Sequence, residues 1–189
     1  MERKQFLCRT LQLGLGSCGL LALEKVAGGM AEAAPNAPDE LLAARQEADF
    51  VRNWVSDLLD TMDEQLPREA RVRLIEGCGR GCFRRHEFKR VIAEQGKGDL
   101  DRLIAAYKKN FEVWREGPAV HVRYGEVSKQ CYCPVVKTRA AKPDDLHCEC
   151  TRSTHQSIFE TALGRPIKVE VVESLRRGGR TCHFVAHVA

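Results

Sequence analysis

Several features that mark common enzymes and nucleic-acid-binding proteins are missing from this sequence of 189 residues. Aromatic side chains make up only 6% of it and are scattered, whereas a nucleic-acid-binding face interleaves aromatic with basic side chains. The His-Glu-x-x-His motif, the nucleophile elbow and the phosphate-binding nucleotide loop are all absent. Internal repeats and low-complexity segments are absent too. We therefore expect no nucleic-acid partner and none of the enzyme classes that these motifs mark.

Cysteine, by contrast, is abundant. The chain has nine cysteines and a formal net charge of +4, with 30 basic and 26 acidic residues. A chain of this length is expected to form one domain, which can bury a core without disulfide bonds. The cysteines are therefore not obviously needed for folding, and this favours a chemical role for some of them.

Residues 1–33 have the layout of an export signal. A basic start, Arg3-Lys4-Gln5-Phe6-Leu7, is followed by an apolar, glycine-rich run from Leu11 to Leu23 and by the small residues Ala31-Glu32-Ala33. The start resembles a twin-arginine signal in which Lys4 replaces the second arginine; an amphipathic N-terminal helix is the alternative. We expect an exported, periplasmic or otherwise extracytoplasmic protein with no membrane span in its mature form. Seven of the nine cysteines would remain after cleavage.

Residues 39–116 have the periodicity of helices. Residues 34–38, Ala-Pro-Asn-Ala-Pro, predict a linker before them. Apolar side chains recur at helical spacing from Val51 to Leu66, which predicts a long amphipathic helix, and Pro67 fits the first position of the next helix. A later helix, ended by Gly117-Pro118, is predicted from an apolar stripe: Leu100, Leu103, Ile104, Tyr107, Phe111 and Trp114.

Residues 117–189 contain three segments in which apolar and polar side chains alternate, and this predicts strands. They are Val120–Tyr124, Ile167–Leu175 and Thr181–Val188, with a hairpin turn at Arg177-Gly178-Gly179. A short helix is predicted from Ser153 or Thr154 to Leu163. We expect an α+β fold in which N-terminal helices pack on a C-terminal antiparallel sheet with one short helix, all in one domain.

Two Cys-x-Cys pairs are the strongest candidate for a site. Cys131 and Cys133 precede a polar loop, and Cys148 and Cys150 follow it. In an extended segment, alternate side chains point to the same side, so the four thiols could converge. Four thiolates close a tetrahedral zinc site or hold an iron–sulfur cluster. We expect zinc, with an iron–sulfur cluster as the alternative cofactor; disulfides or buried thiols are the other interpretations.

A second cysteine pair, Cys78 and Cys82, lies among three glycines that are expected to interrupt a helix. Helical periodicity resumes afterwards, which would place Cys82 near a helix N-terminus with His86 one turn further on. The helix dipole and nearby cations would favour its thiolate form. The cations are Arg80, Arg84 and Arg85. A reactive or metal-binding thiol is therefore predicted at Cys82, with a Cys78–Cys82 disulfide or packed thiols as the alternative.

The chain from Gly77 to the C-terminus resembles a known family. The motifs are Cys-Tyr-Cys-Pro at 131–134, Cys-x-Cys at 148–150, Phe159-Glu160, Leu-Gly-Arg-Pro at 163–166 and Glu-Ser-Leu-x-x-Gly-Gly-x-x-Cys-x-Phe at 173–184. They are similar to the L-2-amino-thiazoline-4-carboxylic acid hydrolase-like family. The final hairpin also resembles the small-molecule-binding domain named after vinyl reductases. The resemblance implies an α+β domain with a ligand pocket, and it would place six cysteines at one site: Cys78, Cys82, Cys131, Cys133, Cys148 and Cys150.

Three functions follow as hypotheses. The first is an exported protein that binds a small molecule, or a metal through its thiolates. The second is a hydrolase of a small cyclic substrate like 2-aminothiazoline-carboxylate, with metal-bound water or the Cys82 thiolate as nucleophile and Glu149 or Glu160 for proton transfer. The third is a thiol–disulfide protein working outside the cytoplasm.

Overall fold

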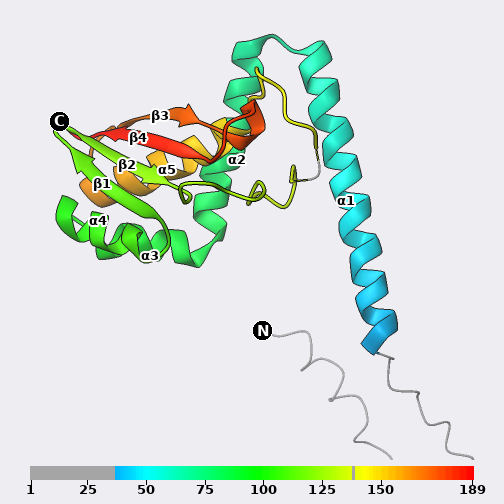
Figure 1. The fold of residues 1–189 in the computed structure, drawn as a ribbon, viewed down its shortest axis with the longest axis horizontal. Coiled ribbons are helices and arrows are strands. Elements are labelled where there is room, and N and C mark those ends of the chain that lie inside the picture. The colour runs from blue at the N-terminus through cyan, green and yellow to red at the C-terminus, as the bar shows by residue number, and fades with distance from the viewer. Residues whose placement is uncertain (1–36, 138) are drawn as a thin grey trace, which may run out of the picture. The chain divides into compact units, whose positions relative to one another are not determined.

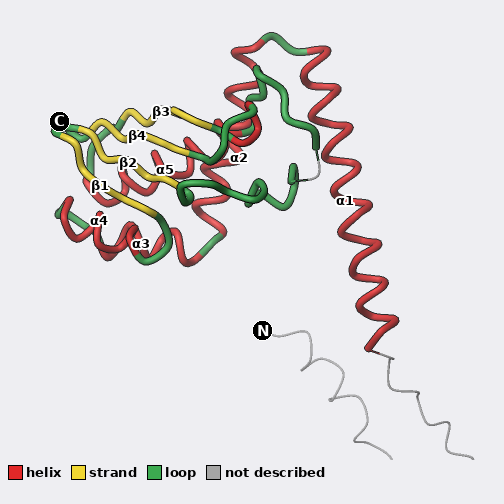
Figure 2. Tube along the Cα trace, viewed as in Figure 1, coloured by secondary structure: helices red, strands yellow, loops and turns green. Residues whose placement is uncertain are grey.

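The computed structural model describes residues 37–137 and 139–189 (Figures 1 and 2). The chain divides into two compact units, Met1–Asp39 and Glu40–Ala189, and the second contains the fold described below. The predicted export segment and residues 34–36 of the linker lie outside the described residues. The helices are α1 (Ala37–Gln65), α2 (Arg68–Arg85), α3 (Glu87–Gln95), α4 (Leu100–Lys108) and α5 (Cys148–Leu163). The strands are β1 (Glu112–Glu116), β2 (Ala119–Arg123), β3 (Lys168–Glu173) and β4 (His183–His187).

The four strands form one antiparallel sheet in the order β1-β2-β4-β3. Val122 on β2 lies opposite both Val113 on β1 and Phe184 on β4, and this register brings the apolar side chains of neighbouring strands together. The predicted α+β class is confirmed, as is the antiparallel pairing of the last two predicted strands.

The hydrophobic core lies between one face of this sheet and helices α3, α4 and α5 (Figure 1). Its largest fully buried side chains are Tyr107 from α4, Phe159 from α5 and Phe184 from β4. As expected from alternation, Phe184 and Ala186 point into this core, whereas His187 is exposed. Gly164 ends α5 with φ 67°, a left-handed conformation that glycine adopts without steric cost.

The prediction of a helix that continues to Trp114 is wrong. Helix α4 ends at Lys108, and Trp114 lies on β1, where its ring stacks on that of His121 at 4.7 Å between centroids. In β1 only Val113 is buried, so the strand shows little alternation of its own. Pairing with β2 satisfies the backbone hydrogen-bonding groups of β1, and this pairing fixes the extended conformation of the segment.

The predicted interruption of a helix by the glycines at 77–81 is also wrong, since α2 is continuous. The glycines allow close packing instead. A Cβ atom on Gly79 would overlap the carbonyl oxygen of Cys150 and lie 2.5 Å from the Ser153 Oγ atom, both on α5. Glycine at position 79 therefore lets the backbones of α2 and α5 approach each other closely.

Helix α5 begins at Cys148, ahead of the predicted start at Ser153 or Thr154. The second Cys-x-Cys pair therefore lies in the first turn of a helix and is not extended. Among the described residues, no helix is long and apolar enough to cross a membrane.

Candidate thiol-lined site

A cavity of about 820 Å³ lies where α2, α3 and α5 meet the segment that follows β2. Three cysteines contribute to its wall: Cys82 from α2, Cys133 from the loop and Cys150 from α5. Aromatic and aliphatic side chains line much of the rest, namely Phe88, Ile92, Phe111, Tyr124, Tyr132 and Ile158. A cavity of this volume with an apolar wall and a few polar groups is typical of small-molecule sites.

Cys82 contacts a cation across the break between α2 and α3. The Lys89 ammonium donates a hydrogen bond to the Cys82 sulfur over 2.7 Å. Both residues line the cavity, as does His86, the residue at which the two helices meet. This contact distinguishes Cys82 from the other two thiols of the wall and makes it the candidate nucleophile.

The surroundings of Cys82 differ from those expected from the sequence. Cys82 lies in the last turn of α2, and the C-terminal end of a helix dipole disfavours a thiolate. The expected cations do not supply the contact either, because Arg80, Arg84 and Arg85 are exposed and absent from the cavity wall. Lys89, on the next helix, supplies it instead.

Cys133 pairs with a histidine that sequence reasoning missed. The His147 Nε2 atom lies 3.2 Å from the Cys133 sulfur. Burial lowers the pKa of His147 to about 4 and raises the pKa of the Cys133 thiol. Near neutral pH the pair is therefore an uncharged thiol donating to a neutral imidazole, and both pKa shifts oppose transfer of the proton from Cys133 to His147.

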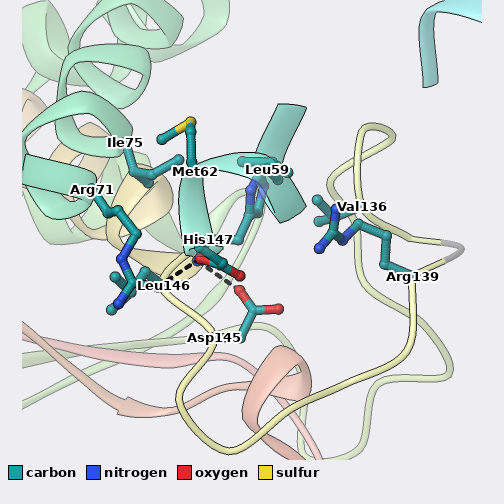
Figure 3. A pocket seen from close by; sticks show the side chains of 10 residues that line it. Leu59, Met62, Arg71, Ile75, Val136, Arg139, Asp145, Leu146 and His147 are labelled. Carbon is teal, nitrogen blue, oxygen red and sulfur yellow. Dashed lines mark hydrogen bonds and ion pairs between the residues drawn. The ribbon is translucent and has the colours of Figure 1, made fainter. Parts of the chain in front are cut away.

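The other face of His147 borders a second, much smaller cavity, shown in Figure 3. Its volume is about 20 Å³, and its wall includes Arg71 from α2 and Asp145. The backbone N–H of His147 donates to the Asp145 carboxylate over 2.7 Å. Two buried atoms at this cavity, His147 Nδ1 and Arg71 Nε, have no hydrogen-bond partner among the described residues. The volume and these two polar atoms suit one ordered water molecule.

Cys150 and Cys148 point to different surroundings. Cys150 faces the main cavity, where burial and then the charges of Cys82 and Cys133 raise its pKa to about 12. Cys148 is buried and lies 2.8 Å from the Ser174 Oγ atom. A hydrogen bond with the Cys182 thiol, followed by burial, raises the pKa of Cys148, and the same bond lowers the pKa of Cys182. Residues two apart on a helix point in nearly opposite directions, so this pair diverges.

The six cysteines that the sequence grouped at one site are thus divided. Cys82, Cys133 and Cys150 line the cavity, whereas Cys148 faces Cys182, Cys131 is half-buried in the loop and Cys78 is exposed. All seven cysteines within residues 37–137 and 139–189 are free thiols, so the alternative Cys78–Cys82 disulfide is not formed. In the same residues, no group of three or more His, Cys, Asp or Glu side chains is arranged to hold a metal ion.

A buried tyrosine–histidine–tyrosine chain borders the cavity through Tyr124 and His155. The Tyr107 hydroxyl lies 3.1 Å from His155 Nδ1, and the Tyr124 hydroxyl lies 3.1 Å from His155 Nε2. Burial, with a smaller contribution from Lys89, lowers the pKa of His155 to about 3. A neutral imidazole has one N–H, so one tyrosine donates to the ring and the other accepts from it. Burial also raises the pKa of both tyrosines, which keeps their hydroxyl protons in place.

The two carboxylates considered for proton transfer lie away from the thiols. Glu160 accepts hydrogen bonds from the Gln156 side chain and from the backbone N–H of Ile167. Glu149 forms ion pairs with Arg152 and Arg177. Neither carboxylate belongs to the cavity wall. The structure therefore does not bring Glu160 together with Cys82.

These features define an α+β protein with a thiol-lined cavity between its helices and the loop after β2. A family model described as "Family of unknown function (DUF6144)" matches residues 29–187. Because this match covers most of the chain, the protein belongs to that family. No curated protein and no solved structure matches the chain.

Proposed function

We propose that this protein binds a small molecule in the thiol-lined cavity and that Cys82 is the thiol that reacts with it. The observation that carries the proposal is the 2.7 Å contact between Lys89 and Cys82 in the wall of a cavity of about 820 Å³. A thiolate is the nucleophilic form of cysteine, and an adjacent ammonium stabilises it.

The cavity wall indicates what kind of molecule would fit. Phe88, Phe111 and Tyr124 offer aromatic surface for a planar or cyclic body. Lys89 and Lys108 bring two positive charges to the same wall, and Glu112 brings one negative charge that is already paired with Arg123. A small cyclic molecule with a carboxylate would therefore match both the shape and the charge of the site.

The proposal is tested by alkylation followed peptide by peptide. Monobromobimane, an aromatic electrophile of suitable size, would be compared with iodoacetamide on reduced, metal-free protein. Cys82 should react faster than the exposed Cys78, and the advantage should be larger for the aromatic reagent because the cavity binds it. Equal rates at Cys78 and Cys82 with both reagents would overturn the proposal, since Cys78 lies outside the cavity wall.

Hydrolysis of a small ring containing sulfur and nitrogen is the second candidate reaction. The Cys133 thiol supports it, because it faces the same cavity as Cys82 and can donate a proton. The Cys82 thiolate would add to the ring carbon, and the ring C–S bond would break as the ring sulfur takes the proton of Cys133. Water would then attack the same carbon, releasing Cys82 and returning a proton to Cys133. Incubation with 2-aminothiazoline-4-carboxylate should yield ring-opened product that is lost in Cys82→Ser. Loss of activity in Glu160→Gln with the fold intact would restore the role that the sequence suggested for Glu160.

Metal binding remains a proposal for the same thiols. Cys82, Cys133 and Cys150 line one cavity, and a metal ion would have to draw them together, because no group of three ligands is arranged for one among the described residues. Three thiolates and a fourth ligand from the Cys131 loop would suit zinc, with an iron–sulfur cluster as the alternative. Elemental analysis and visible absorbance of anaerobically purified protein separate zinc, iron with sulfide, and no metal.

Export is proposed from the sequence of residues 1–33 alone. Cell fractionation combined with N-terminal sequencing tests it, and intact Met1 in the cytoplasmic fraction would exclude it. If export is confirmed, a thiol–disulfide function becomes testable by trapping mixed disulfides at Cys82.

A further inference from the structure

Helix α1 exposes an unusual amount of apolar surface. Six large apolar side chains along it are between 42% and 72% exposed: Leu41, Leu42, Phe50, Val51, Trp54 and Leu58. Isolated exposed apolar residues are ordinary, but a row of them along one face of a helix marks an interaction surface. Leu41, Val51 and Leu58 form such a row, whereas Leu42 and Phe50 lie outside it. What covers this row is indicated by its spacing and by the charges beside it.

The spacing from Leu41 to Leu58 is that of a coiled coil. Apolar residues alternate at intervals of three and four, which gives heptad positions a and d. The a positions are Leu41, Ala48 and Val55, and the d positions are Ala44, Val51 and Leu58. Five of these six residues are exposed and Val55 is half-buried. The seam spans 18 residues of helix, or about 27 Å at 1.5 Å per residue.

The chain's own contacts with α1 lie in the C-terminal part of the helix, where Leu59, Met62 and Asp63 line the small cavity beside His147. The Arg139 guanidinium binds the Ser56 hydroxyl and the Asp60 carboxylate, and the Lys142 ammonium binds Asp63. Ser56 and Asp63 occupy b positions and Asp60 an f position of the same heptad. Within the described residues, the protomer therefore holds the C-terminal part of α1, including the half-buried a position Val55, and leaves the other five seam positions exposed.

The charges that flank the seam specify the partner and its direction. Glu40 and Glu47 occupy g positions, and Arg45 and Arg52 occupy e positions. In a parallel pair, each g side chain meets the e side chain five residues further along the partner helix. Glu40 would then meet Arg45 and Glu47 would meet Arg52 of a second copy. In an antiparallel pair, g meets g and e meets e, which would place like charges together.

We propose that α1 pairs with α1 of a second copy of this chain as a parallel, two-stranded coiled coil along Leu41–Leu58. The proposal concerns assembly and is independent of the chemistry at the thiol-lined cavity. Alanine at two of the six seam positions lets the helices approach closely, and Trp54, at a g position, covers the edge of the seam.

The test measures the mass of the full chain in solution by light scattering on a sizing column from about 1 to 100 µM. The wild type should have twice the mass of one chain. The Leu41→Asp/Val51→Asp variant should be a monomer, with a dissociation constant weakened at least about 100-fold because two charges per chain would enter the seam. The matched control Gln46→Asp/Asn53→Asp changes f positions of the same helix and should stay dimeric.

Exchanging the charges tests whether the two α1 helices are parallel. It also distinguishes loss of pairing from unfolding, because the second exchange should restore the dimer. Glu40→Arg/Glu47→Arg should weaken the dimer about tenfold at low salt, and adding Arg45→Glu/Arg52→Glu should restore it, because the pairs are then re-formed with opposite sign. Circular dichroism confirms that each variant keeps its helices. A wild-type monomer at 100 µM, or an Asp variant that dimerises like the wild type, would overturn the proposal.

Discussion

The Lys89 ammonium lies 2.7 Å from the Cys82 sulfur because the helical direction changes between them. His86, with φ −97° and ψ 111°, is extended and separates α2 from α3. A single straight helix would place residues seven apart two turns from each other. The break at His86 folds the first turn of α3 back toward the last turn of α2, so the contact depends on a local departure from helical geometry.

Replacing this lysine should slow the reaction of Cys82. In Lys89→Met the ammonium is lost while the length and apolar character of the side chain are kept. Loss of the hydrogen bond to the reacting sulfur should raise the barrier to alkylation by about 1 kcal/mol, so the rate with iodoacetamide at pH 6–7 should fall about fivefold. The rate is read from the Cys82 peptide by mass spectrometry.

Two internal references accompany that measurement. Lys108→Met removes another cation of the cavity wall that makes no hydrogen bond to Cys82 among the described residues, so it should leave the rate nearly unchanged. Cys182 is 7% exposed and should react more slowly than Cys82 in every variant. If Lys89→Met and Lys108→Met behave alike, the contact has no role in reactivity.

Buried neutral histidines predict a loss of stability in mild acid. Burial lowers the pKa of His155 to about 3 and of His147 to about 4, whereas both are near 6.5 in the unfolded chain. The unfolded chain therefore binds more protons below about pH 6.5, and stability is lost as the pH falls from there toward the folded pKa values. Going from pH 7 to pH 5 should lower the free energy of unfolding by about 2 kcal/mol for each histidine.

Urea unfolding at both pH values measures this effect. His155→Gln should be less stable than the wild type at pH 7, because its bonds to two tyrosines are disturbed, but its stability should change less between pH 7 and pH 5. The exposed His187→Gln serves as control and should keep the wild-type dependence. A wild type equally stable at both pH values would show that the two imidazoles are not buried in the neutral form.

The fold was largely predictable because its signals are local. Alternation at Val120 and Val122, and again at Phe184 and Ala186, predicted strands that pair in the structure. Glycine after Leu163 predicted the end of α5 correctly. The failures occur where contacts with other elements decide the structure. Trp114 continues a helical spacing by coincidence, and Gly79 resembles a helix breaker when read alone but is a packing residue once α5 lies against it.

The site was predictable only in part, because its contacts join distant parts of the chain. Cys82 was identified from its glycine-rich, basic surroundings. The partners of His155 are 48 and 31 residues away, and no local pattern predicts such contacts. His147 was equally hidden, since the helix that begins after it turns its ring toward Cys133. The extended geometry assumed for Cys148 and Cys150 was reasonable for a Cys-x-Cys sequence, but α5 includes both residues.

Gly79→Ala should destabilise the protein far more than helix propensity suggests. A methyl group there would overlap the Cys150 carbonyl oxygen and lie 2.5 Å from Ser153 Oγ. Forcing α2 and α5 apart should cost about 2–3 kcal/mol. Gly77→Ala is a matched control on the same helix, because its Cβ atom would meet nothing closer than 3.9 Å. That control should be stabilised by about 0.5–1 kcal/mol. Thermal unfolding of both variants measures the difference, and equal effects would contradict the close packing at Gly79.

Arg176 should control the loop that carries Cys133 and His147. Its guanidinium is 3% exposed and donates to the Asp145 carboxylate over 2.6 Å. It also donates to backbone carbonyl oxygens of the same loop, at Val136, Arg139 and Ala140. Arg176→Met would leave the Asp145 carboxylate buried without its cation, which should cost about 3–5 kcal/mol.

The stability lost in Arg176→Met has two parts: one from the unpaired charge of Asp145, and one from the missing hydrogen bonds to the loop. In Arg176→Met/Asp145→Asn the unpaired charge is removed, so much of the stability should return, but the loop carbonyls still lack their donor. Alkylation of Cys133 should therefore be faster than in the wild type in both variants, whereas stability recovers in the double variant only. Arg177→Met removes a neighbouring arginine that binds Glu149 and the Asp145 carbonyl, and it should leave the rate at Cys133 close to that of the wild type. An unchanged rate at Cys133 in the double variant would show that the loop holds its conformation without Arg176.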